Sequence, residues 1–435
     1  MSNPTQPSFP PRPKVAVIGA GISGMGAAYD LRDSCDVTLF EAEPRLGGHA
    51  RTKLAGKRGD QPVDTGFIVF NYANYPNMVR LFEELDVPVV KSDMSFGASI
   101  DGGRLEYGLR SLNTVFAQRK NIVNPKFLRM VRDIMRFNAY ALGASKDTDK
   151  TLADLMDDMN LSDWFRDYYI LPLSGAIWST PTAKIMDFPA HALLTFFQNH
   201  ALLHHKNQHQ WYTVDGGSIQ YVSRLEGALR RAGVTIRLKS PIAQVTRTPA
   251  GCRVQAVGAE AEQFDHVIFA VHTDQAHSLL SDPSPQEAKA LSQFEYQENS
   301  ITLHADPIVM PKRKSCWASW VYTEEKGHQD TPIDLSYWMN SLQPIPHDDP
   351  MFVSLNSALP IKEELIYDQV TLHHPVYDHN ALATQKTIAG LNGQNATWYC
   401  GAWMKNGFHE DGLSSALDVT RALKAQIAIQ PAAAE

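Results

Sequence analysis

The chain has 435 residues, of which 43% are hydrophobic and 20% charged, a composition typical of a soluble globular protein with more than one domain. Its net charge of -7 at pH 7 argues against an overall nucleic-acid binder. The four cysteines lie far apart and form no C-x-x-C pair. This spacing argues against a zinc ribbon, a disulfide scaffold or a dithiol centre, and favours reduced thiols.

The first 11 residues are expected to form a flexible leader. The opening run "MSNPTQPSFPPRPK" is rich in proline and has no apolar stretch, so it resembles neither a signal peptide nor a membrane anchor. No later segment approaches 18 uninterrupted apolar residues, the length needed to span a bilayer. We therefore expect a cytoplasmic protein.

The next segment predicts a nucleotide-binding βαβ unit. "KVAVIGAG" is typical of a buried parallel strand, and "ISGMGAAYDLRD" of the helix that follows it. Gly19, Gly21 and Gly24 between them have the G-x-G-x-x-G spacing. In such a loop the first glycine permits a tight turn, the second lets the backbone approach a pyrophosphate, and the third allows close helix packing. The helix N-terminus supplies free N–H groups for the phosphates.

The second strand, "DVTLFEA", ends at Glu41, which has the spacing expected for an acid that binds ribose hydroxyls and disfavours the 2′-phosphate of NADP. A βαβ unit without a ligand would show the same glycines, but the strand, helix and acid together favour a nucleotide. A second glycine pair follows in "RLGGHART", and "PVDTGFIVFN" comes next. These elements favour FAD in an extended pose over NAD.

Glu41-x-x-x-Arg45-x-Gly47-Gly48, with the Arg-Thr pair that follows, resembles the signature of the flavin-containing amine oxidase and phytoene desaturase superfamily. "FDHVIFAVHTDQA" is similar to its middle strand, and "WYCGAWMKNGFHEDGLSSALDVTRAL" to its last FAD element. The resemblance implies an FAD-dependent oxidoreductase of the α/β class. It would have a Rossmann-like FAD-binding domain, built on a doubly wound parallel sheet, and a mixed α+β substrate domain.

Three further runs, "VDTGFIVFNYANYPNM", "WYTVDGGSIQY" and "AVHTDQA", resemble a bacterial subgroup described as predicted NAD/FAD-binding proteins. That subgroup is similar to the desaturase of furan fatty acid synthesis. The resemblance implies desaturation of a methyl-branched acyl chain carried by a phospholipid. A flavin amine oxidase that releases peroxide, and an FAD-bound interaction protein without turnover, are the alternatives. No second G-x-G-x-x-G follows a strand, so electrons should enter from the substrate rather than from NAD(P)H, and the electron acceptor stays open between oxygen and another carrier.

The resemblance assigns residues 12–75, 208–284 and 392–428 to a discontinuous FAD-binding domain. Residues 76–207 and 285–391 would form the substrate and cap domain. "GVTIRLKSPIAQVTRT" predicts two short strands around Pro241, where the backbone of Val245 either meets the adenine end of FAD or forms a plain sheet edge. The cofactor contacts implied are Gly19, Gly21, Ile22, Ser23, Gly24, Glu41, Arg45, Gly48, Arg51, Thr52, Gly66, Phe67, Val245, Ala270, Trp403, His409, Gly412 and Leu413.

Two histidines are candidates for proton transfer. His409 lies in the turn that starts the last predicted helix, where it would either bind the cofactor or relay a proton. His205 lies in "NHALLHHKNQHQ" and is predicted to accept a proton in the substrate channel. His200 and His204 have a spacing that zinc could use, but no cysteine or carboxylate completes the set, so no metal is expected.

Aromatic residues are dense in the expected substrate domain, and each alone would be a core residue. Amine oxidases carry an aromatic cage on the substrate face of the flavin. By that resemblance the predicted substrate contacts are Trp178, Tyr337, Trp398 and Tyr399.

Residues 125–140 predict a basic amphipathic helix. Phe127, Met130, Val131, Ile134 and Phe137 would share one face, with arginines opposite. Such a helix either contacts an anionic membrane surface, which would place the protein at the inner face of the cell membrane, or covers the core with its apolar face.

Overall fold

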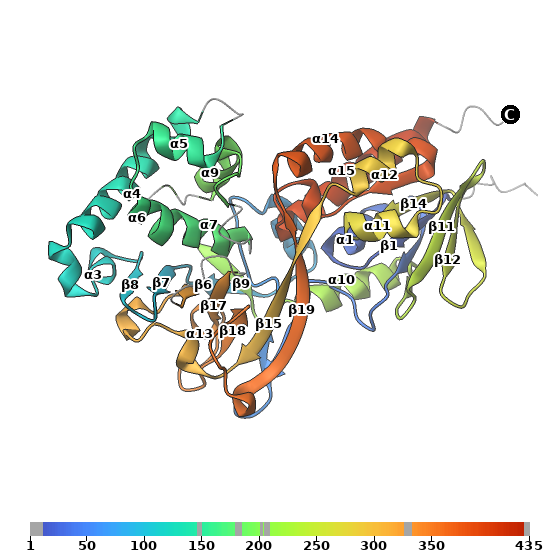
Figure 1. Ribbon diagram of the computed structural model, residues 1–435. Helices are drawn as coiled ribbons and strands as arrows, with labels where there is room; N and C mark the ends of the chain where they lie inside the picture. The colour runs from blue at the N-terminus through green and yellow to red at the C-terminus, as the bar shows by residue number, and fades with distance from the viewer. Residues whose placement is uncertain are drawn as a thin grey trace, which may run out of the picture. The chain divides into compact units, whose positions relative to one another are not determined.

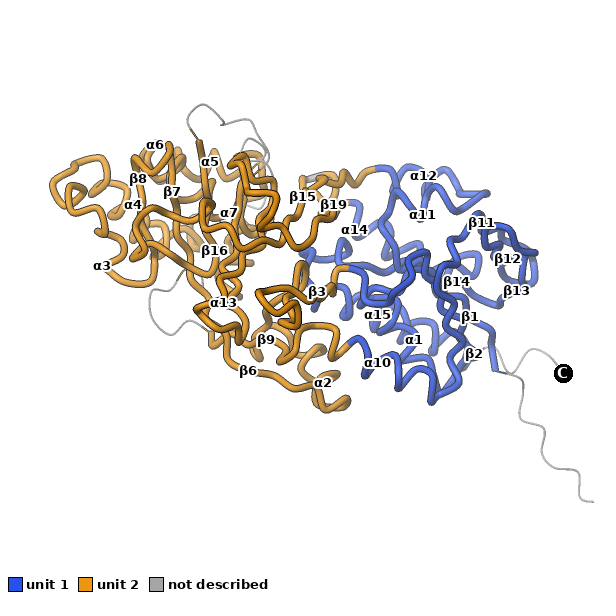
Figure 2. Tube along the Cα trace, turned by 90° about the horizontal axis from the view of Figure 1, so that it is seen from below, with its two compact units in different colours: residues 1–48, 222–292, 384–435 blue, residues 49–221, 293–383 orange. Residues whose placement is uncertain are grey.

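The computed structural model describes residues 12–145, 150–178, 185–200, 203, 209–325 and 333–429. It divides into two compact units (Figure 2). Unit 1 contains the described residues of 1–48, 222–292 and 384–435, and unit 2 those of 49–221 and 293–383. The expected leader, 1–11, lies outside the described residues.

The boundaries of the units differ from the predicted domains. Residues 49–75 and 208–221 fall in unit 2 rather than with the glycine-rich loop. The reason is strand pairing. β5 (Val69–Asn71) and β6 (Val89–Ser92) both pair antiparallel with β9 (Trp211–Val214), which fixes these segments to one another.

Unit 1 is built on a five-stranded sheet in the order β10-β2-β1-β14-β20, in which every neighbouring pair is parallel. The central strand β1 is almost wholly buried, as expected for a parallel sheet covered by helices. This arrangement confirms the predicted α/β, Rossmann-like fold. The strands are β1 (Lys14–Ile18), β2 (Asp36–Phe40), β10 (Thr235–Arg237), β14 (His266–Phe269) and β20 (Thr397–Tyr399).

Helices surround this sheet, and α1 packs closely on α15 (Figure 1). A Cβ atom on Gly26 of α1 would lie 2.4 Å from Leu413 Cδ1, so glycine permits the close approach. The helices are α1 (Ile22–Leu31), α10 (Ile219–Arg231), α11 (Thr273–Leu279), α12 (Pro285–Leu291), α14 (His379–Leu391) and α15 (His409–Ile429).

A second, antiparallel sheet in unit 1 contains β11 (Ile242–Thr248), β12 (Gly251–Ala256) and β13 (Ala261–Phe264). β10 and β11 lie on the two sides of Pro241, so the prediction of two short strands there is confirmed.

Unit 2 is built on a seven-stranded mixed sheet in the order β19-β15-β18-β17-β16-β7-β8. β16 pairs parallel with β7, and the other neighbours are antiparallel. The strands are β7 (Phe96–Ile100), β8 (Leu105–Gly108), β15 (Glu295–His304), β16 (Trp320–Glu324), β17 (Asp334–Trp338), β18 (Phe352–Leu355) and β19 (Ile366–Val376). A hairpin of β3 (Thr52–Ala55) and β4 (Gln61–Asp64) also belongs to this unit.

A layer of helices lies along one side of the seven-stranded sheet (Figure 1). Its members are α3 (Leu112–Val115), the 3-10 helix η1 (Arg119–Val123), α4 (Pro125–Ala144), α5 (Leu152–Asp158), α6 (Asp163–Phe165), the π-helix η2 (Arg166–Ile170), α7 (Leu171–Trp178) and α9 (Ala190–Asn199). Unit 2 also contains α2 (Pro76–Glu84) and α13 (Met339–Leu342). Among the residues that the structure describes, no helix has the length and apolar character needed to cross a membrane.

The helix predicted over residues 125–140 is present as α4, and of the two readings of its apolar face the structure favours the one in which that face covers the core. Phe127, Met130 and Phe137 are buried in the core of unit 2. The neighbouring helices α6 and α9 pack against α4 and account for this burial. Val131 and Ile134, the other two residues of the predicted face, are partly buried.

Candidate cofactor site

The glycine-rich loop after β1 has the geometry of a pyrophosphate cradle. Gly19 has a φ of +95°, and a Cβ there would lie 2.7 Å from Ala270 O. A Cβ on Gly24 would lie 1.8 Å from Gly19 O. A Cβ on Gly21, by contrast, meets no atom within 4 Å, so its side-chain position opens onto the space that a phosphate needs. The first N–H groups of α1, at Ile22 and Ser23, have no partner within the helix and favour an anion there.

Glu41 is oriented beside this loop by two backbone groups. The Ala20 N–H donates to Glu41 Oε2 at 2.7 Å, and the Glu43 N–H donates to Oε1 at 2.9 Å. Each carboxylate oxygen keeps a further lone pair that can accept from a ribose hydroxyl. The geometry therefore fits the ribose role predicted for Glu41.

The second glycine pair lies against the first. The Gly47 N–H donates to Ala20 O at 2.8 Å, and a Cβ on Gly48 would lie 3.0 Å from Gly21 Cα. Arg45 holds this turn, because its Nη2 donates to Gly48 O at 2.8 Å. Any side chain at Gly48 would have to enter the space of Gly21.

The N-terminus of α15 meets the N-terminus of α1. A Cβ on Gly412 would lie 2.9 Å from Ile22 Cγ2 and from Ser23 Oγ. His409 and Glu410 lie in the first turn of α15. Asp411 accepts from the Phe408 N–H at 2.9 Å, and burial raises its pKa to about 6. This helix end adds a partial positive charge beside the cradle.

Trp403 joins the loops that follow β20 and β14. Its Nε1 donates to Val271 O at 3.0 Å, and the side chain is buried. The edge where β1, β2, β14 and β20 end thus brings together the predicted residues Gly19, Gly21, Ile22, Ser23, Gly24, Glu41, Arg45, Gly48, Ala270, Trp403, His409, Gly412 and Leu413. In open α/β sheets this carboxyl edge is where nucleotides bind.

The other predicted cofactor residues have different surroundings. Arg51 forms an ion pair with Asp368 and donates to Thr65 Oγ1 at 3.1 Å. A Cβ on Gly66 would lie 2.0 Å from His49 O, which also accepts from the Phe67 N–H. Arg51, Gly66 and Phe67 all belong to unit 2, so their contact with the cofactor stays a prediction.

Thr52, also in unit 2, donates a hydrogen bond to the buried carboxylate of Asp64, which accepts several hydrogen bonds that the sequence did not predict. Its Oγ1 donates to Asp64 Oδ1 at 2.6 Å. The Ser218 N–H and Oγ donate to the same carboxylate oxygen at 2.9 and 2.7 Å, and Gln343 Nε2 donates to Oδ2 at 2.9 Å. Asp64 therefore fastens β3, the loop before α10 and the residue after α13 to β4. Burial raises its pKa to about 6, although these hydrogen bonds oppose the shift.

We expect Asp64 to lower stability as the pH rises. Its pKa of about 6 in the folded state exceeds the ordinary value of 3.8, so protonation of Asp64 favours the folded state. The contribution of this protonation to the free energy of unfolding is lost as the pH rises through about 6. The unfolding free energy of Asp64→Asn, taken relative to the parent, should therefore be about 1 kcal/mol higher at about pH 7 than at about pH 5. Denaturant titrations at both pH values measure this, with the exposed Asp60→Asn as the control. A difference that does not change with pH would contradict the assignment.

Val245 lies in the interior of unit 1, away from solvent. Its carbonyl accepts from the Ser281 N–H at 2.9 Å and from Ser281 Oγ at 3.0 Å. The Val245 carbonyl therefore already accepts two hydrogen bonds from within the protein, and the contact of Val245 with adenine stays a prediction.

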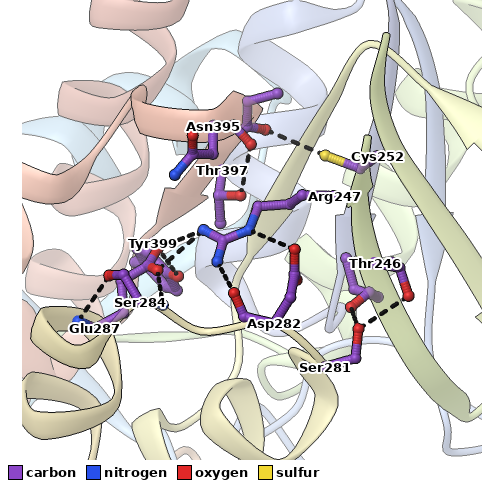
Figure 3. Close-up of polar contacts among 12 residues, drawn as sticks. Thr246, Arg247, Cys252, Ser281, Asp282, Ser284, Glu287, Asn395, Thr397 and Tyr399 are labelled. Carbon is purple, nitrogen blue, oxygen red and sulfur yellow. Dashed lines mark hydrogen bonds and ion pairs between the residues drawn. The ribbon is translucent and has the colours of Figure 1, made fainter. Parts of the chain in front are cut away.

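Beside Val245, Arg247 forms a buried polar network (Figure 3). Its Nη1 lies 2.8 Å from Glu287 Oε1, which also accepts from the Tyr399 hydroxyl at 3.0 Å. Asp282 adds a second acid at 3.4 Å. This network connects β11, α12 and β20, and gave no signal in the sequence.

Two of the four predicted substrate residues are part of this interior. Tyr399 is fully buried, stacks on Phe269 with ring centroids 5.6 Å apart, and donates its hydroxyl to Glu287. Trp398 is buried in the same strand, beside His266. These positions favour a structural role for both, since they lie within the parallel sheet.

The other two lie in unit 2. Trp178 is buried against Phe188 and Phe196, with ring centroids 5.2 and 4.9 Å away. Tyr337 is partly buried and packs edge-on against Trp320 at 5.2 Å. Both are packed against other aromatic rings, and their contact with a substrate stays a prediction.

The histidine cluster is only partly described. His204 and His205 lie outside the described residues. His200 is packed against the Phe196 ring at 3.8 Å, and burial lowers its pKa to about 4. Within the described part of the chain, no three His, Cys, Asp or Glu side chains gather in a way that would hold a metal.

Unit 2 also contains a cavity of about 640 Å³. Its lining is polar and includes Lys91, Asp93, Arg110, His209 and Asn340. Arg110 and Asp93 form an ion pair at 3.2 Å. This lining does not suit an acyl chain, so we assign no apolar substrate to it.

The sequence model of the flavin containing amine oxidoreductase family matches residues 22–350, well over half of the chain. The protein belongs to this family. FAD is therefore its cofactor, and the protein is an FAD-dependent oxidoreductase. The cradle described above fits that cofactor.

This chain is similar to the probable zeta-carotene desaturase of Synechococcus elongatus, with 22% identity over 342 residues that cover 73% of this chain and 69% of the relative. Its fold is similar to that of a CLA-producing fatty acid isomerase from P. acnes, with a TM-score of 0.68, 13% identity and coverage of 95% and 99%. Cyclohexylamine oxidase from Brevibacterium oxydans is similar too, with a TM-score of 0.68, 14% identity and coverage of 96% and 100%. At these identities the solved structures show the fold alone.

Proposed function

We propose that this protein desaturates a long acyl chain, namely a methyl-branched chain carried by a phospholipid, at the inner face of the cell membrane. The observation that carries the proposal is the similarity to a zeta-carotene desaturase over 73% of the chain. That relative is named for the dehydrogenation of a long apolar hydrocarbon. Three sequence runs resemble a bacterial subgroup that is similar to the furan fatty acid pathway desaturase, and this supports an acyl chain.

The reaction removes two hydrogens from adjacent carbons and forms a carbon–carbon double bond. Bound FAD supplies the acceptor for the hydride and its two electrons. The other hydrogen leaves as a proton, for which His409, in the first turn of α15, is the proposed relay. The Gly412 N–H already donates to Phe408 O at 3.1 Å, so we propose that the partial positive charge of this helix end, at Gly412 and Leu413, stabilises negative charge that develops on the cofactor.

Unit 2 carries the proposed substrate contacts, Trp178 and Tyr337. The aromatic cluster around Trp178 offers apolar surface and no charge. Apolar surface of this kind would exclude water and accommodate an acyl chain. His205 remains a proposed proton acceptor of this channel.

Anaerobic mixing with a defined lipid tests the proposal. The FAD-loaded protein is mixed with a detergent-dispersed phospholipid that bears a methyl-branched monoenoic chain. We expect the visible absorbance of the flavin to bleach, and the lipid to lose two hydrogens by mass spectrometry. A flavin that stays oxidised would contradict the proposal.

Membership of the flavin containing amine oxidoreductase family favours amine oxidation as the second candidate. That function predicts bleaching by primary amines and release of peroxide in air, with no change in lipid mass. A protein that only binds FAD would be reduced by neither substrate.

NADH and NADPH should not reduce the flavin at a rate that supports turnover. The sequence shows one G-x-G-x-x-G loop after a strand, which FAD itself uses. Stopped-flow absorbance under anaerobic conditions measures the reaction, with dithionite as the positive control. Rapid bleaching by either nucleotide would reverse the proposed direction of electron flow.

A further inference from the structure

We infer that α3, η1 and the solvent face of α4 dock unit 2 onto the surface of an anionic lipid bilayer. We call this the docking surface. It groups large apolar side chains that are strongly exposed, with Leu112 at 76% and Val123 at 79%. Its apolar members are Leu112, Ile122, Val123, Leu128 and Met135.

The packing of α4 explains why these side chains face solvent. Phe127, Met130 and Phe137 fill the core, so the stripe through Leu128, Arg132 and Met135 points away from it. These positions are spaced i, i+4 and i+7, which places them on one face of a helix. This face is distinct from the apolar face that the sequence predicted for a membrane.

Every exposed charge of residues 111–140 is positive, although the whole chain has a net charge of -7. The one acid in this range, Asp133, is fully buried. The basic members of the docking surface are Arg119, Lys120, Lys126, Arg129, Arg132 and Arg136. Interfacial helices combine aliphatic side chains that enter the bilayer with basic side chains that meet anionic headgroups.

The positive charges of the docking surface also argue against a second copy of the chain as its partner. A second copy of the chain would bring two positive surfaces together, at a cost in repulsion. Exposed aliphatic side chains in such number are costly in water and mark a contact site, and a bilayer buries them without requiring a shaped partner. An anionic bilayer satisfies both the apolar and the basic residues.

This inference extends the proposed function but does not depend on turnover. Vesicle binding is measured with the FAD-loaded full chain and no substrate. The probes are vesicles of phosphatidylcholine alone, and vesicles with equal amounts of phosphatidylglycerol and phosphatidylcholine. We expect sedimentation with the second kind, weakened by salt because the headgroup contacts are screened.

The apolar arm of the test is the triple variant Leu112→Ser, Ile122→Ser, Val123→Ser. These side chains are exposed, so the fold should persist, while binding to the anionic vesicles should fall about a hundredfold. Leu54→Ser is the matched control, because Leu54 is 67% exposed in the β3–β4 hairpin of the same unit. It should bind as the parent does.

The charge arm is the double variant Lys120→Gln, Lys126→Gln, which should weaken binding at low salt about thirtyfold. Lys289→Gln with Lys362→Gln removes the same charge elsewhere and serves as the control. The arginines of α4 stay in place, because Arg129, Arg132 and Arg136 lie within 4.0 Å of the buried Asp133 carboxylate.

The inference would be overturned if the parent protein did not bind anionic vesicles, or if the apolar and charge variants bound them as tightly as the parent does. A parent dimer that the apolar variant converts to a monomer would assign the surface to a second copy instead. Flavin reduction by detergent-dispersed lipid is measured separately. Its failure would reject the proposed function and leave the vesicle result standing.

Discussion

The Gly21→Val variant should be purified as a folded protein that lacks FAD. Gly21 has φ and ψ of -71° and -174°, a conformation that valine adopts readily, and a Cβ there meets no protein atom within 4 Å. The added side chain would instead occupy the pyrophosphate position and keep it from the first N–H groups of α1. We expect affinity for FAD to fall by at least about a hundredfold. The ratio of flavin to protein absorbance measures the loss.

Two other glycines make this result specific. Gly143→Val, in α4, also adds a side chain where no atom lies within 4 Å, and should keep full flavin occupancy. Gly24→Ala places a Cβ 1.8 Å from Gly19 O, so it should disturb the fold as well as the cofactor. Full occupancy in Gly21→Val would show that this loop does not hold the pyrophosphate.

The Glu287→Ala variant should lose about 3 kcal/mol of unfolding free energy, the low end of the range for breaking a buried ion pair. It leaves the buried guanidinium of Arg247 with Asp282 alone, and leaves the Tyr399 hydroxyl without its acceptor. Burial raises the pKa of Glu287, but the hydrogen bonds from Ser284 and Arg247 outweigh this effect and lower it. The contribution of the pair is therefore lost as the pH falls through the lowered pKa.

Chemical denaturation of the FAD-loaded protein measures this loss. Arg230→Gln is the matched control, since it breaks an exposed i,i+4 pair with Glu226 and should cost about 0.5 kcal/mol. Equal effects of the two substitutions would mean that the Arg247 network contributes no more than a surface pair.

The parts of the fold that could be predicted depend on residues that are close to one another in the sequence. The glycines after β1 and the acid after β2 belong to one βαβ unit, so their geometry follows from neighbours in sequence. The helix over residues 125–140 was also predictable, because the helical period of its apolar residues can be read from the segment itself. Which face it buries was left open, since α6 and α9 decide it and no local pattern reveals them.

The parts of the site that escaped prediction depend on distant residues. Asp64 meets Ser218 and Gln343 from 154 and 279 residues away. Tyr399 looked like a substrate contact because an aromatic residue before a glycine fits the family pattern. Its partner Glu287 lies 112 residues earlier, and only the folded sheet shows that the hydroxyl is already used.

The strand order of unit 1 has a consequence for biosynthesis. The first two strands leave the ribosome early, but β20 and α15 are made about 350 residues later, so α1, which contacts β1 and β2, lacks its contact with α15 until then. Such non-local pairing folds slowly and leaves apolar surface open in the meantime. We expect the nascent chain to need protection by chaperones, and FAD to enter only after translation has ended.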